Sequence, residues 1–364
     1  MIVEKKALFR VDASSAIGSG HLMRCLTLAK ALQQSGWSIV FACRAHPGNL
    51  IQWLRKQSFD VIELTQPKET TATDYAAWLG VTEQQDAAEL LLQLQQPVDL
   101  LVIDHYGLSK EFELAMTGFF HKLLVIDDLA NRFHHCDYLL DQNLYPKLQS
   151  RYETLVNKEA QLLLGPSYVL LRPEFAKLRR TADVNRLCFL VFYGGTDELN
   201  LSSLTINALQ QLQKTDFHAD IVIGLANRHK AELEQLCAED DRFKLHIQTP
   251  HMAELMSKAT LMIGAGGSTH WERCALALPG LVVTLAENQV ASTLCLADAG
   301  ACSYIGHGLD LTASRLTQAV QQLLDNPEQL ERMSKQAKQL VPEGGGCVAI
   351  VDLFNTEFQG RYQG

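Results

Sequence analysis

The fold is decided by residues 7–34, which read ALFRVDASSAIGSGHLMRCLTLAKALQQ. The opening run is mainly apolar and predicts a short buried strand over Ala7–Val11. A Gly/Ser loop follows. Apolar residues then recur at helical spacing, which predicts a helix over His21–Gln34 that Gly36 ends. A strand, a glycine loop and a helix in this order form the first βα unit of a parallel sheet.

The rest of the first half repeats this alternation. Two of its runs, Leu100–Ile103 and Leu123–Ile126, are continuously apolar, as in strands that are buried on both faces. The other predicted strands are Ser38–Cys43, Val61–Leu64 and Tyr138–Leu140, and the predicted helices are Asn49–Lys56 and Glu83–Leu94.

The alternation is interrupted once, between Leu144 and Asp183, where Gly165-Pro166 and Arg172-Pro173 occur. We interpret this segment as the connection between two domains. The expected domains are 1–165 and 166–364, with a C-terminal helix packing back toward the first. The second domain resumes the alternation, with strands at Leu187–Phe192, Ile221–Ile223, Leu261–Gly264 and Leu281–Leu285 and helices at Leu201–Leu212, Ser268–Leu278 and Gln289–Ala299.

This pattern predicts two Rossmann-like α/β domains whose parallel sheets face a cleft. Ligands of such sheets bind beyond the carboxyl ends of the strands. Binding and catalytic residues are therefore expected in the loops that follow the predicted strands.

Composition narrows the classes of partner. The 364 residues carry 32 Lys and Arg against 41 Asp and Glu, a net charge of −9, which disfavours nucleic acid as a partner. No run of about 18 apolar residues predicts a membrane span. The nine cysteines are scattered without a C-x-x-C pair, as in a cytoplasmic protein with reduced thiols. His134-His135-Cys136 are adjacent, so they cannot all face one metal ion.

The first glycine loop ends in a histidine. Gly18 and Gly20 let the main chain approach a ligand, and the amides at the start of the helix favour an anion there. The same position disfavours the imidazolium form of His21, and a neutral imidazole can accept a proton from water. We list Asp12, Gly18 and Gly20 as candidate binding residues and His21 as the candidate base. A plain βα turn remains an alternative.

The second glycine cluster is GAGGSTHWERC, residues 264–274. Its glycines and its two hydroxyl residues, Ser268 and Thr269, predict a cradle for a diphosphate at a strand-to-helix turn. Glu272 lies one turn into the helix, where it can accept hydrogen bonds from a ribose. Compensation of the helix dipole is the alternative role for this carboxylate.

Two further loops are candidates. Gly194 and Gly195, within Tyr193–Asp197, are expected either to face the phosphates or to form a simple turn. Asp104-His105-Tyr106-Gly107 closes a buried strand, where ligand-facing residues gather, and each side chain there has either a structural or a catalytic role. No D-x-D motif occurs, and the neighbours Asp127 and Asp128 are interpreted as one structural and one ligand-facing carboxylate.

These motifs together resemble one family. The chain is similar to the UDP-2,4-diacetamido-2,4,6-trideoxy-β-L-altropyranose hydrolases of pseudaminic acid biosynthesis. The resemblance rests on the order of RVDASSAIGSGHLMRC (10–25), VIDHYG (102–107), VIDDLANR (125–132), LLDQNL (139–144), GPSYVLLRPEF (165–175), FYGGTD (192–197) and GAGGSTHWERCALALPGLVVTLAENQ (264–289).

The resemblance implies the glycosyltransferase-B architecture, like that of the UDP-GlcNAc transferase that makes lipid II. It also implies inverting, metal-independent attack of water on the anomeric carbon of a UDP-sugar, without a cofactor. In these terms His21 is the base and Tyr106 lines the sugar site. The resemblance assigns the binding of uridine and diphosphate to Gly266, Gly267, Ser268, Thr269 and Glu272. It places Gln289 near the diphosphate or sugar. His270 stands where the family often has a hydroxyl residue.

Two other functions are compatible with these motifs. A UDP-sugar glycosyltransferase has the same fold and base, but it needs an acceptor site, and the first domain shows no amphipathic basic helix for one. A nucleotide-sugar sensor would bind without turnover, and a catalytic histidine would serve no purpose there.

Overall fold

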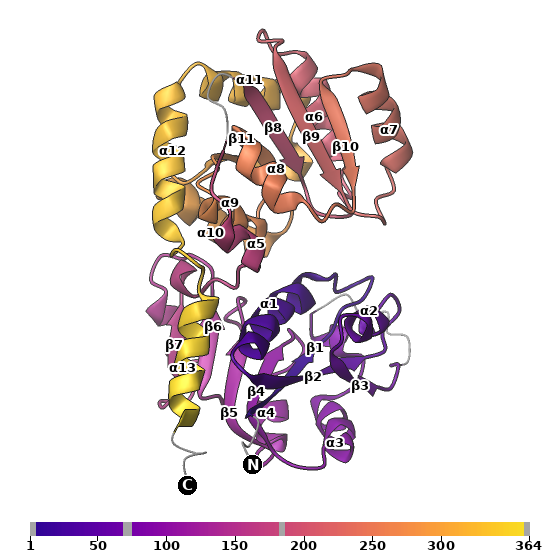
Figure 1. Cartoon of the computed structure of the whole chain (residues 1–364), viewed down its shortest axis with the longest axis vertical. Helices are drawn as coiled ribbons and strands as arrows, with labels where there is room; N and C mark the ends of the chain where they lie inside the picture. Colours follow the sequence, from indigo (N-terminus) through magenta and orange to yellow (C-terminus); the bar gives the residue numbers. More distant parts are fainter. Residues whose placement is uncertain (1–4, 68–74, 182–185, 360–364) are drawn as a thin grey trace. The chain divides into compact units, whose positions relative to one another are not determined.

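The structure is a computed structural model that describes residues 5–67, 75–181 and 186–359. The chain forms two compact units (Figure 1). The first comprises Met1–Arg172 together with Gly345–Gly364, and the second comprises Pro173–Gly344. The chain thus passes into the second unit after Arg172, where the sequence analysis placed the division after residue 165.

The first unit is built on a parallel sheet with the strand order β3-β2-β1-β4-β5-β6-β7. Every strand predicted for the first half is present and extends a little beyond its predicted ends. The strands are β1 (Lys5–Val11), β2 (Trp37–Arg44), β3 (Asp60–Leu64), β4 (Val98–Asp104), β5 (Phe120–Ile126), β6 (Tyr138–Asp141) and β7 (Gln161–Leu164).

The strand β7 corrects the prediction that 144–183 is only a connection. Gln161 pairs with Tyr138 at the start of β6, so this short run adds the last strand to the sheet. The backbone N–H of Gly165 then donates to the carbonyl of Asp141 (2.7 Å), with Gly165 at φ +90°. The run has only four residues and precedes a Gly-Pro pair, so its local sequence signals a loop, and its pairing with β6 overrides that signal.

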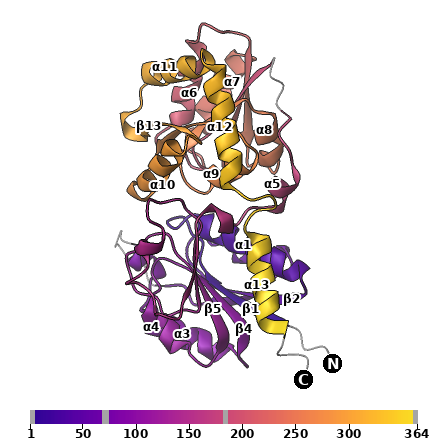
Figure 2. The same ribbon diagram turned by 90° about the vertical axis from the view of Figure 1, so that its left-hand side faces the viewer.

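Helices cover both faces of this sheet. The helices α1 (Gly20–Gln34), α2 (Ile51–Lys56) and α13 (Cys347–Gln359) pack on one face, and α3 (Glu83–Gln93) and α4 (Lys110–Ala115) on the other. Figure 2 shows α13 alongside the first sheet. Its Phe354 is fully buried in the same cluster as Phe9, and Asn355 Oδ1 accepts hydrogen bonds from Lys5 and Trp37 (2.8 and 3.0 Å). The C-terminal helix is therefore part of the first core.

The second unit repeats the architecture with the strand order β10-β9-β8-β11-β12-β13. Its strands are β8 (Leu187–Phe192), β9 (Phe217–Ile223), β10 (Phe243–Ile247), β11 (Leu261–Ala265), β12 (Gly280–Thr284) and β13 (Ser303–His307). The helices are α5 (Pro173–Lys177), α6 (Leu201–Gln210), α7 (Lys230–Glu239), α8 (Met252–Lys258), α9 (Thr269–Ala275), α10 (Glu287–Asp298), α11 (Ala313–Leu324) and α12 (Pro327–Leu340). These parallel sheets confirm the predicted fold class.

The close approach of two neighbouring strands explains one of the glycines in the second sheet. Gly264 pairs with Phe192, and a Cβ atom on Gly264 would lie 2.2 Å from the Phe192 carbonyl oxygen. Any side chain would force β8 and β11 apart at their carboxyl ends. Gly264 therefore brings the loops after these two strands close together.

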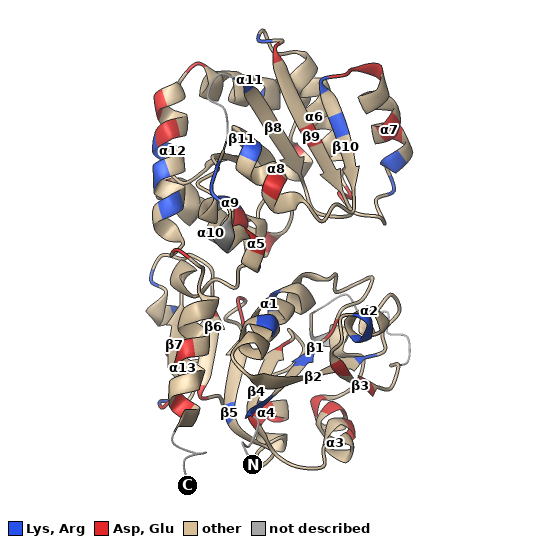
Figure 3. Ribbon diagram, viewed as in Figure 1, with Lys and Arg blue, Asp and Glu red and all other residues tan. Residues whose placement is uncertain are grey.

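The charged residues are dispersed over both units, with acidic and basic segments interspersed (Figure 3). Within residues 5–67, 75–181 and 186–359, each helix is too short or too polar to cross a lipid bilayer.

Candidate functional site

The first unit concentrates its polar side chains where the strand order reverses. β1 and β4 are neighbours, and the chain leaves them toward opposite sides of the sheet. Loops after two such strands diverge and leave room for a ligand. The loop from β1 ends at His21 in the first turn of α1, and β4 ends at Asp104. The predicted base thus lies beside the predicted D-H-Y segment.

His21 and Asp104 form a hydrogen-bonded pair. Nδ1 of His21 lies 2.6 Å from Oδ1 of Asp104, and the Asp104 side chain is fully buried. Burial alone would raise the pKa of the Asp104 carboxyl, but Arg24 and His21 beside it hold that pKa well below its ordinary value. Because the carboxylate can only accept, Nδ1 carries the proton. The neutral ring then has its lone pair on Nε2, as a general base requires.

Tyr106 packs against the histidine. The two rings are perpendicular, with centroids 4.5 Å apart, and the Tyr106 hydroxyl donates to Oδ1 of Asp128 at 2.5 Å. Burial, and next the Asp128 charge, raise the pKa of Tyr106, so the phenol keeps its proton. The residue that the resemblance assigned to the sugar site is therefore fixed beside His21, the predicted base.

Arg24 belongs to this cluster and was not singled out from the sequence. Its Nε and Nη2 donate to the two oxygens of Asp104 (2.5 and 2.7 Å), and its Nη1 donates to Asp128 (2.9 Å). The sequence contains one feature that points to Arg24: it follows His21 by three residues and therefore shares its helix face. The partners are 80 and 104 positions away, and nothing local reveals them.

Aromatic side chains form a wall beside the histidine. Trp78, in the 3₁₀ helix η1 (Ala76–Leu79), stacks on Tyr106 with centroids 5.8 Å apart and lies nearly perpendicular to the His21 ring, with centroids 6.5 Å apart. Tyr75 contacts both Trp78 and Tyr106. Such a wall suits the apolar face, methyl groups or acetamido groups of a sugar. Sequence analysis did not identify Tyr75 or Trp78.

Asp12 directly follows β1 as expected, but its side chain is enclosed. Its carboxylate is fully buried and accepts from the Arg10 guanidinium (2.7 and 2.9 Å) and from the Arg44 backbone N–H (2.6 Å). His105 Nε2 lies 3.3 Å away on another side. Burial opposes ionisation, yet Arg10 and then His105 and His46 hold the pKa of Asp12 well below its usual range. Asp12 therefore supports the loop from beneath and presents no carboxylate to a ligand.

Asp127 and Asp128 have different environments. Asp127 is fully buried, receives the Ala130 N–H (2.9 Å) and contacts Arg132 (2.8 Å). Asp128 is partly exposed and holds Tyr106 and Arg24. Only Asp128 is in contact with the cluster around His21.

The glycines of the first loop differ in their backbone. Gly18 has φ +77°, and its N–H donates to the carbonyl of Ser14 (2.9 Å), which closes a tight turn before the helix. Open space surrounds a Cβ built at Gly18 or Gly20. For Gly18 the backbone, rather than a neighbour, requires glycine.

In the second unit, loops of the expected type follow three adjacent strands, β8, β11 and β12. Gly194, after β8, has φ +93°, and Gly195 lies beside Gly224. Asp197 closes this loop by accepting the N–H groups of Leu201 and Ser202 at the start of α6 (2.9 and 2.8 Å), which have no partner within the helix. The loop is therefore anchored at Asp197, with Gly195 exposed before it.

The loop after β11 carries the predicted diphosphate residues. Gly267 has φ +113°, and a Cβ at Gly266 would lie 2.9 Å from Thr293 Oγ1 and 3.4 Å from Gln289 Oε1. Gln289, on α10, accepts the Leu285 N–H through Oε1 (2.8 Å) within the connection after β12, and its side chain lies beside Gly266 and Gly267 of the β11 loop. Three of the residues predicted to bind UDP have exposed or half-buried side chains: Ser268, Thr269 and Glu272.

His270 is enclosed beneath this loop. Its Nε2 lies 3.2 Å from Thr293 Oγ1, and burial, together with the charge of Arg273, lowers the pKa of His270 to about 3. The ring is therefore neutral and ties α9 to α10.

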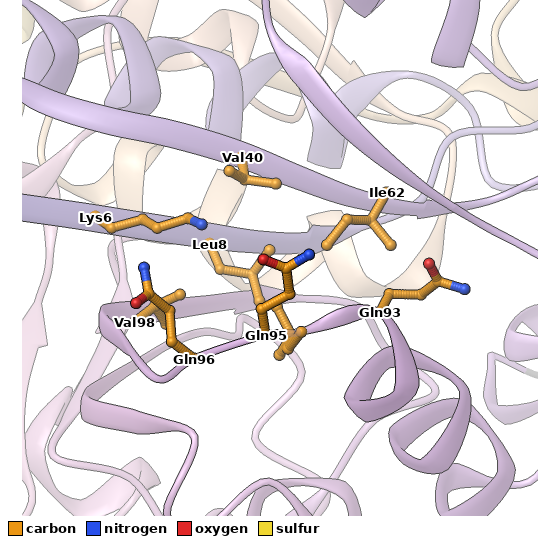
Figure 4. Close-up of a pocket in the computed structure, with 9 residues that line it drawn as sticks. Lys6, Leu8, Val40, Ile62, Gln93, Gln95, Gln96 and Val98 are labelled. Carbon is orange, nitrogen blue, oxygen red and sulfur yellow. The ribbon is translucent and has the colours of Figure 1, made fainter.

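Neither the histidine–cysteine run nor the hollow shown in Figure 4 adds a site. Across the described residues, no group of three or more His, Cys, Asp or Glu side chains is arranged to hold a metal ion, and His134 Nδ1 is bound to Glu113 (2.6 Å). A hollow of about 210 Å³ is lined by Lys6, aliphatic residues and glutamines (Figure 4). Lys6 and Val98 lie at the amino-terminal ends of β1 and β4. The hollow is therefore at the opposite end of these strands from Asp104.

Comparisons with known proteins agree with the fold described above. The family model of the glycosyltransferase family 28 C-terminal domain matches residues 189–343. MurG of Acinetobacter baumannii superimposes with a TM-score of 0.67 at 18% identity, over 97% of this chain and 99% of that one. The calicheamicin glycosyltransferase CalG4 superimposes with a TM-score of 0.65 at 14% identity, over the whole of both chains. These likenesses confirm the glycosyltransferase-B fold.

A curated relative is closer in sequence. The UDP-2,4-diacetamido-2,4,6-trideoxy-beta-L-altropyranose hydrolase of Campylobacter jejuni is 31% identical over 299 residues, which cover 81% of this chain and 97% of the relative. The resemblance found in the motifs therefore extends along most of both sequences, and the chain belongs to the family of this hydrolase.

Proposed function

We propose that the protein hydrolyses UDP-2,4-diacetamido-2,4,6-trideoxy-β-L-altropyranose to the free sugar and UDP, in pseudaminic acid biosynthesis in the cytoplasm. The observation that carries the proposal is the His21–Asp104 pair at the carboxyl ends of β1 and β4. The family relationship supplies the substrate, because the Campylobacter relative is named for it.

The proposed reaction is one displacement at the anomeric carbon. The water oxygen attacks C1 while the bond between C1 and the UDP oxygen breaks, and UDP leaves with that electron pair. Nε2 of His21 takes the proton from water, and Asp104 stabilises the imidazolium that forms. Tyr106 lines the sugar site beside the base.

UDP binding is assigned to the second unit. We propose that the amides near Gly266 and Gly267, with Ser268 and Thr269, receive the diphosphate without a metal ion or cofactor. Glu272 accepts from the ribose. Gly194, Gly195 and Gln289 complete the phosphate side, and Gly18 and Gly20 shape the loop before His21 in the first unit.

The test compares wild type with His21→Asn. Purified wild type should release UDP and the free sugar from the UDP-diacetamido sugar, as followed by NMR. The variant should lose at least about 10²-fold in turnover and keep its UDP affinity. A variant that retains more than a tenth of the activity would remove His21 from the mechanism. Failure of wild type on every UDP-diacetamido sugar would contradict the proposed function.

A UDP-sugar glycosyltransferase is the second candidate, because the family 28 domain match and the MurG fold are shared with transferases. The two functions differ in the absence of an acceptor. A hydrolase releases UDP from the sugar nucleotide at its full rate, whereas a transferase releases it slowly until an acceptor is added.

A further inference from the structure

Arg24 is the only side chain of the His21 cluster that contacts both of its carboxylates, among the contacts that the structure describes. It holds Asp104 through two nitrogens and Asp128 through the third. Asp104 binds the proposed base, and Asp128 binds the hydroxyl of Tyr106. A planar guanidinium can make such a fixed fork, and a lysine ammonium cannot.

We infer that Arg24 is a positioning residue that sets His21 and Tyr106 relative to each other and keeps His21 available as a base. This inference rests on the proposed function. It assigns to Arg24 no contact with substrate. Arg24 acts through Asp104, which ends β4, and through Asp128, which lies in the loop after the neighbouring strand β5.

The geometric part of the argument starts from α1. Arg24 lies one turn after His21, so its contacts with Asp104 and Asp128 fix the helix start against β4 and against the loop after β5. Its side chain is 11% exposed, and this burial limits its movement. Without the fork, the ion pairs that join the two carboxylates would be lost, and the contact between the His21 and Tyr106 rings would have to hold the two groups in place.

The electrostatic part concerns the charge of Asp104. A fully buried carboxylate is costly unless a cation compensates it. Arg24 supplies that cation, and its Nη2 lies 3.1 Å from Nδ1 of His21. Without Arg24 the Asp104 carboxylate would lose this compensating charge and the two contacts that fix its oxygens, and with them the fixed direction of its bond to Nδ1 of His21.

The test uses Arg24→Met, Arg24→Lys and, as a matched control, Arg55→Met. Arg55 also pairs with a carboxylate, Glu63 (2.8 Å), but both side chains are well exposed and belong to α2 and β3. Turnover of the UDP-sugar is measured together with UDP affinity and thermal unfolding. Both Arg24 variants should lose at least about 10²-fold in kcat, while UDP affinity changes less than about twofold. The Arg55 variant should behave as wild type.

A double-variant cycle separates positioning from a general structural effect. Arg24→Met in the His21→Asn background should cost less than about threefold in kcat, because both changes disable one unit. A full further loss in that background would mean that Arg24 acts independently of His21. Wild-type kcat in Arg24→Lys would show that charge alone suffices and would overturn the bridging role. An inactive wild type would instead contradict the proposed function.

If Arg24→Met fails to fold, Asp128→Asn tests the same bridge. The asparagine can still accept from Tyr106 but loses the ion pair with Arg24. A loss of at least about tenfold in kcat that disappears in the Tyr106→Phe background supports the bridge. An unchanged kcat contradicts it.

Discussion

Nδ1 of His21 lies 2.6 Å from a carboxylate oxygen of Asp104, although 83 positions separate the two residues in the sequence. The first ends the loop after β1, and the second ends β4, its neighbour in the sheet. The pairing of β1 with β4 therefore brings His21, the proposed base, to the carboxylate that orients it. It also fixes which nitrogen of the ring is left to accept a proton.

Replacing Asp104 with Asn should lower kcat by about 10²-fold or more. The amide offers one acceptor and one donor, whereas His21 and Arg24 together require acceptors on both oxygens. Either one of these contacts becomes a donor facing a donor, or the His21 ring takes the other tautomer and loses the lone pair on Nε2. UDP binding, measured by calorimetry, should stay within about twofold of wild type. A kcat above a tenth of the wild-type value would show that His21 does not need this carboxylate.

Glu272→Ala should remove discrimination between UDP and dUDP. The wild-type carboxylate is proposed to accept from the ribose hydroxyls, and loss of charge-assisted hydrogen bonds costs about 1.5–3 kcal/mol. Calorimetry with both nucleotides gives the comparison. Wild type should prefer UDP, and the variant should bind the two equally. Equal binding by wild type would mean that Glu272 does not read the 2′-hydroxyl.

Activity should survive excess EDTA. The proposed diphosphate site consists of backbone amides at glycine turns and hydroxyl groups, and such groups do not depend on a divalent cation. Turnover is measured after dialysis against chelator, with and without added Mg²⁺ or Mn²⁺. A loss that either cation restores would contradict this account of the diphosphate site.

Asp141 should make the fold less stable as the pH rises. Burial, and next the charge of Asp128, raise the pKa of the Asp141 carboxyl from 3.8 to about 7. The folded chain then binds a proton that the unfolded chain releases, so this contribution to the free energy of unfolding is complete below about pH 4 and is lost as the pH approaches 7. Tyr152 lies 3.0 Å from this carboxyl.

The neutral variant Asp141→Asn should not show this loss. Its amide oxygen can accept from the Tyr152 hydroxyl, as the Asp141 carboxyl does. Thermal unfolding of both proteins at a series of pH values gives the difference. The variant should be the more stable protein at pH 8, and its advantage should shrink toward pH 4. Parallel stability curves would show that Asp141 is already ionised throughout.

Much of the fold follows from local sequence, because buried parallel strands are continuous apolar runs and glycines mark the turns after them. The residues 7–34 and 261–275 illustrate this. β7 could not be predicted, since its four residues become a strand only through pairing with β6. Arg24 and Trp78 were missed for a related reason: their roles depend on partners brought near by the sheet. The burial of Asp12 depends likewise on Arg10 and on distant residues of other elements.

Stereochemistry follows from whether an aspartate can act as a nucleophile. A covalent route needs a carboxylate with a free lone pair aimed at the anomeric carbon. Asp12 and Asp127 are fully buried. Asp104 has both oxygens bound to Arg24, and Asp128 holds Tyr106 and Arg24. Each candidate therefore has a supporting role that a covalent bond to sugar would break.

Direct attack of water should accordingly invert the anomeric centre, because a single displacement inverts and two displacements retain. Hydrolysis in ¹⁸O-water, followed by NMR before mutarotation and by mass spectrometry, gives both the configuration and the position of the label. The label should appear on C1 of an inverted sugar and not in UDP. Label in UDP would mean that water attacks phosphorus. Label on a sugar of retained configuration would mean a covalent intermediate, and Asp128, the partly exposed carboxylate of the cluster, would be the first residue to replace.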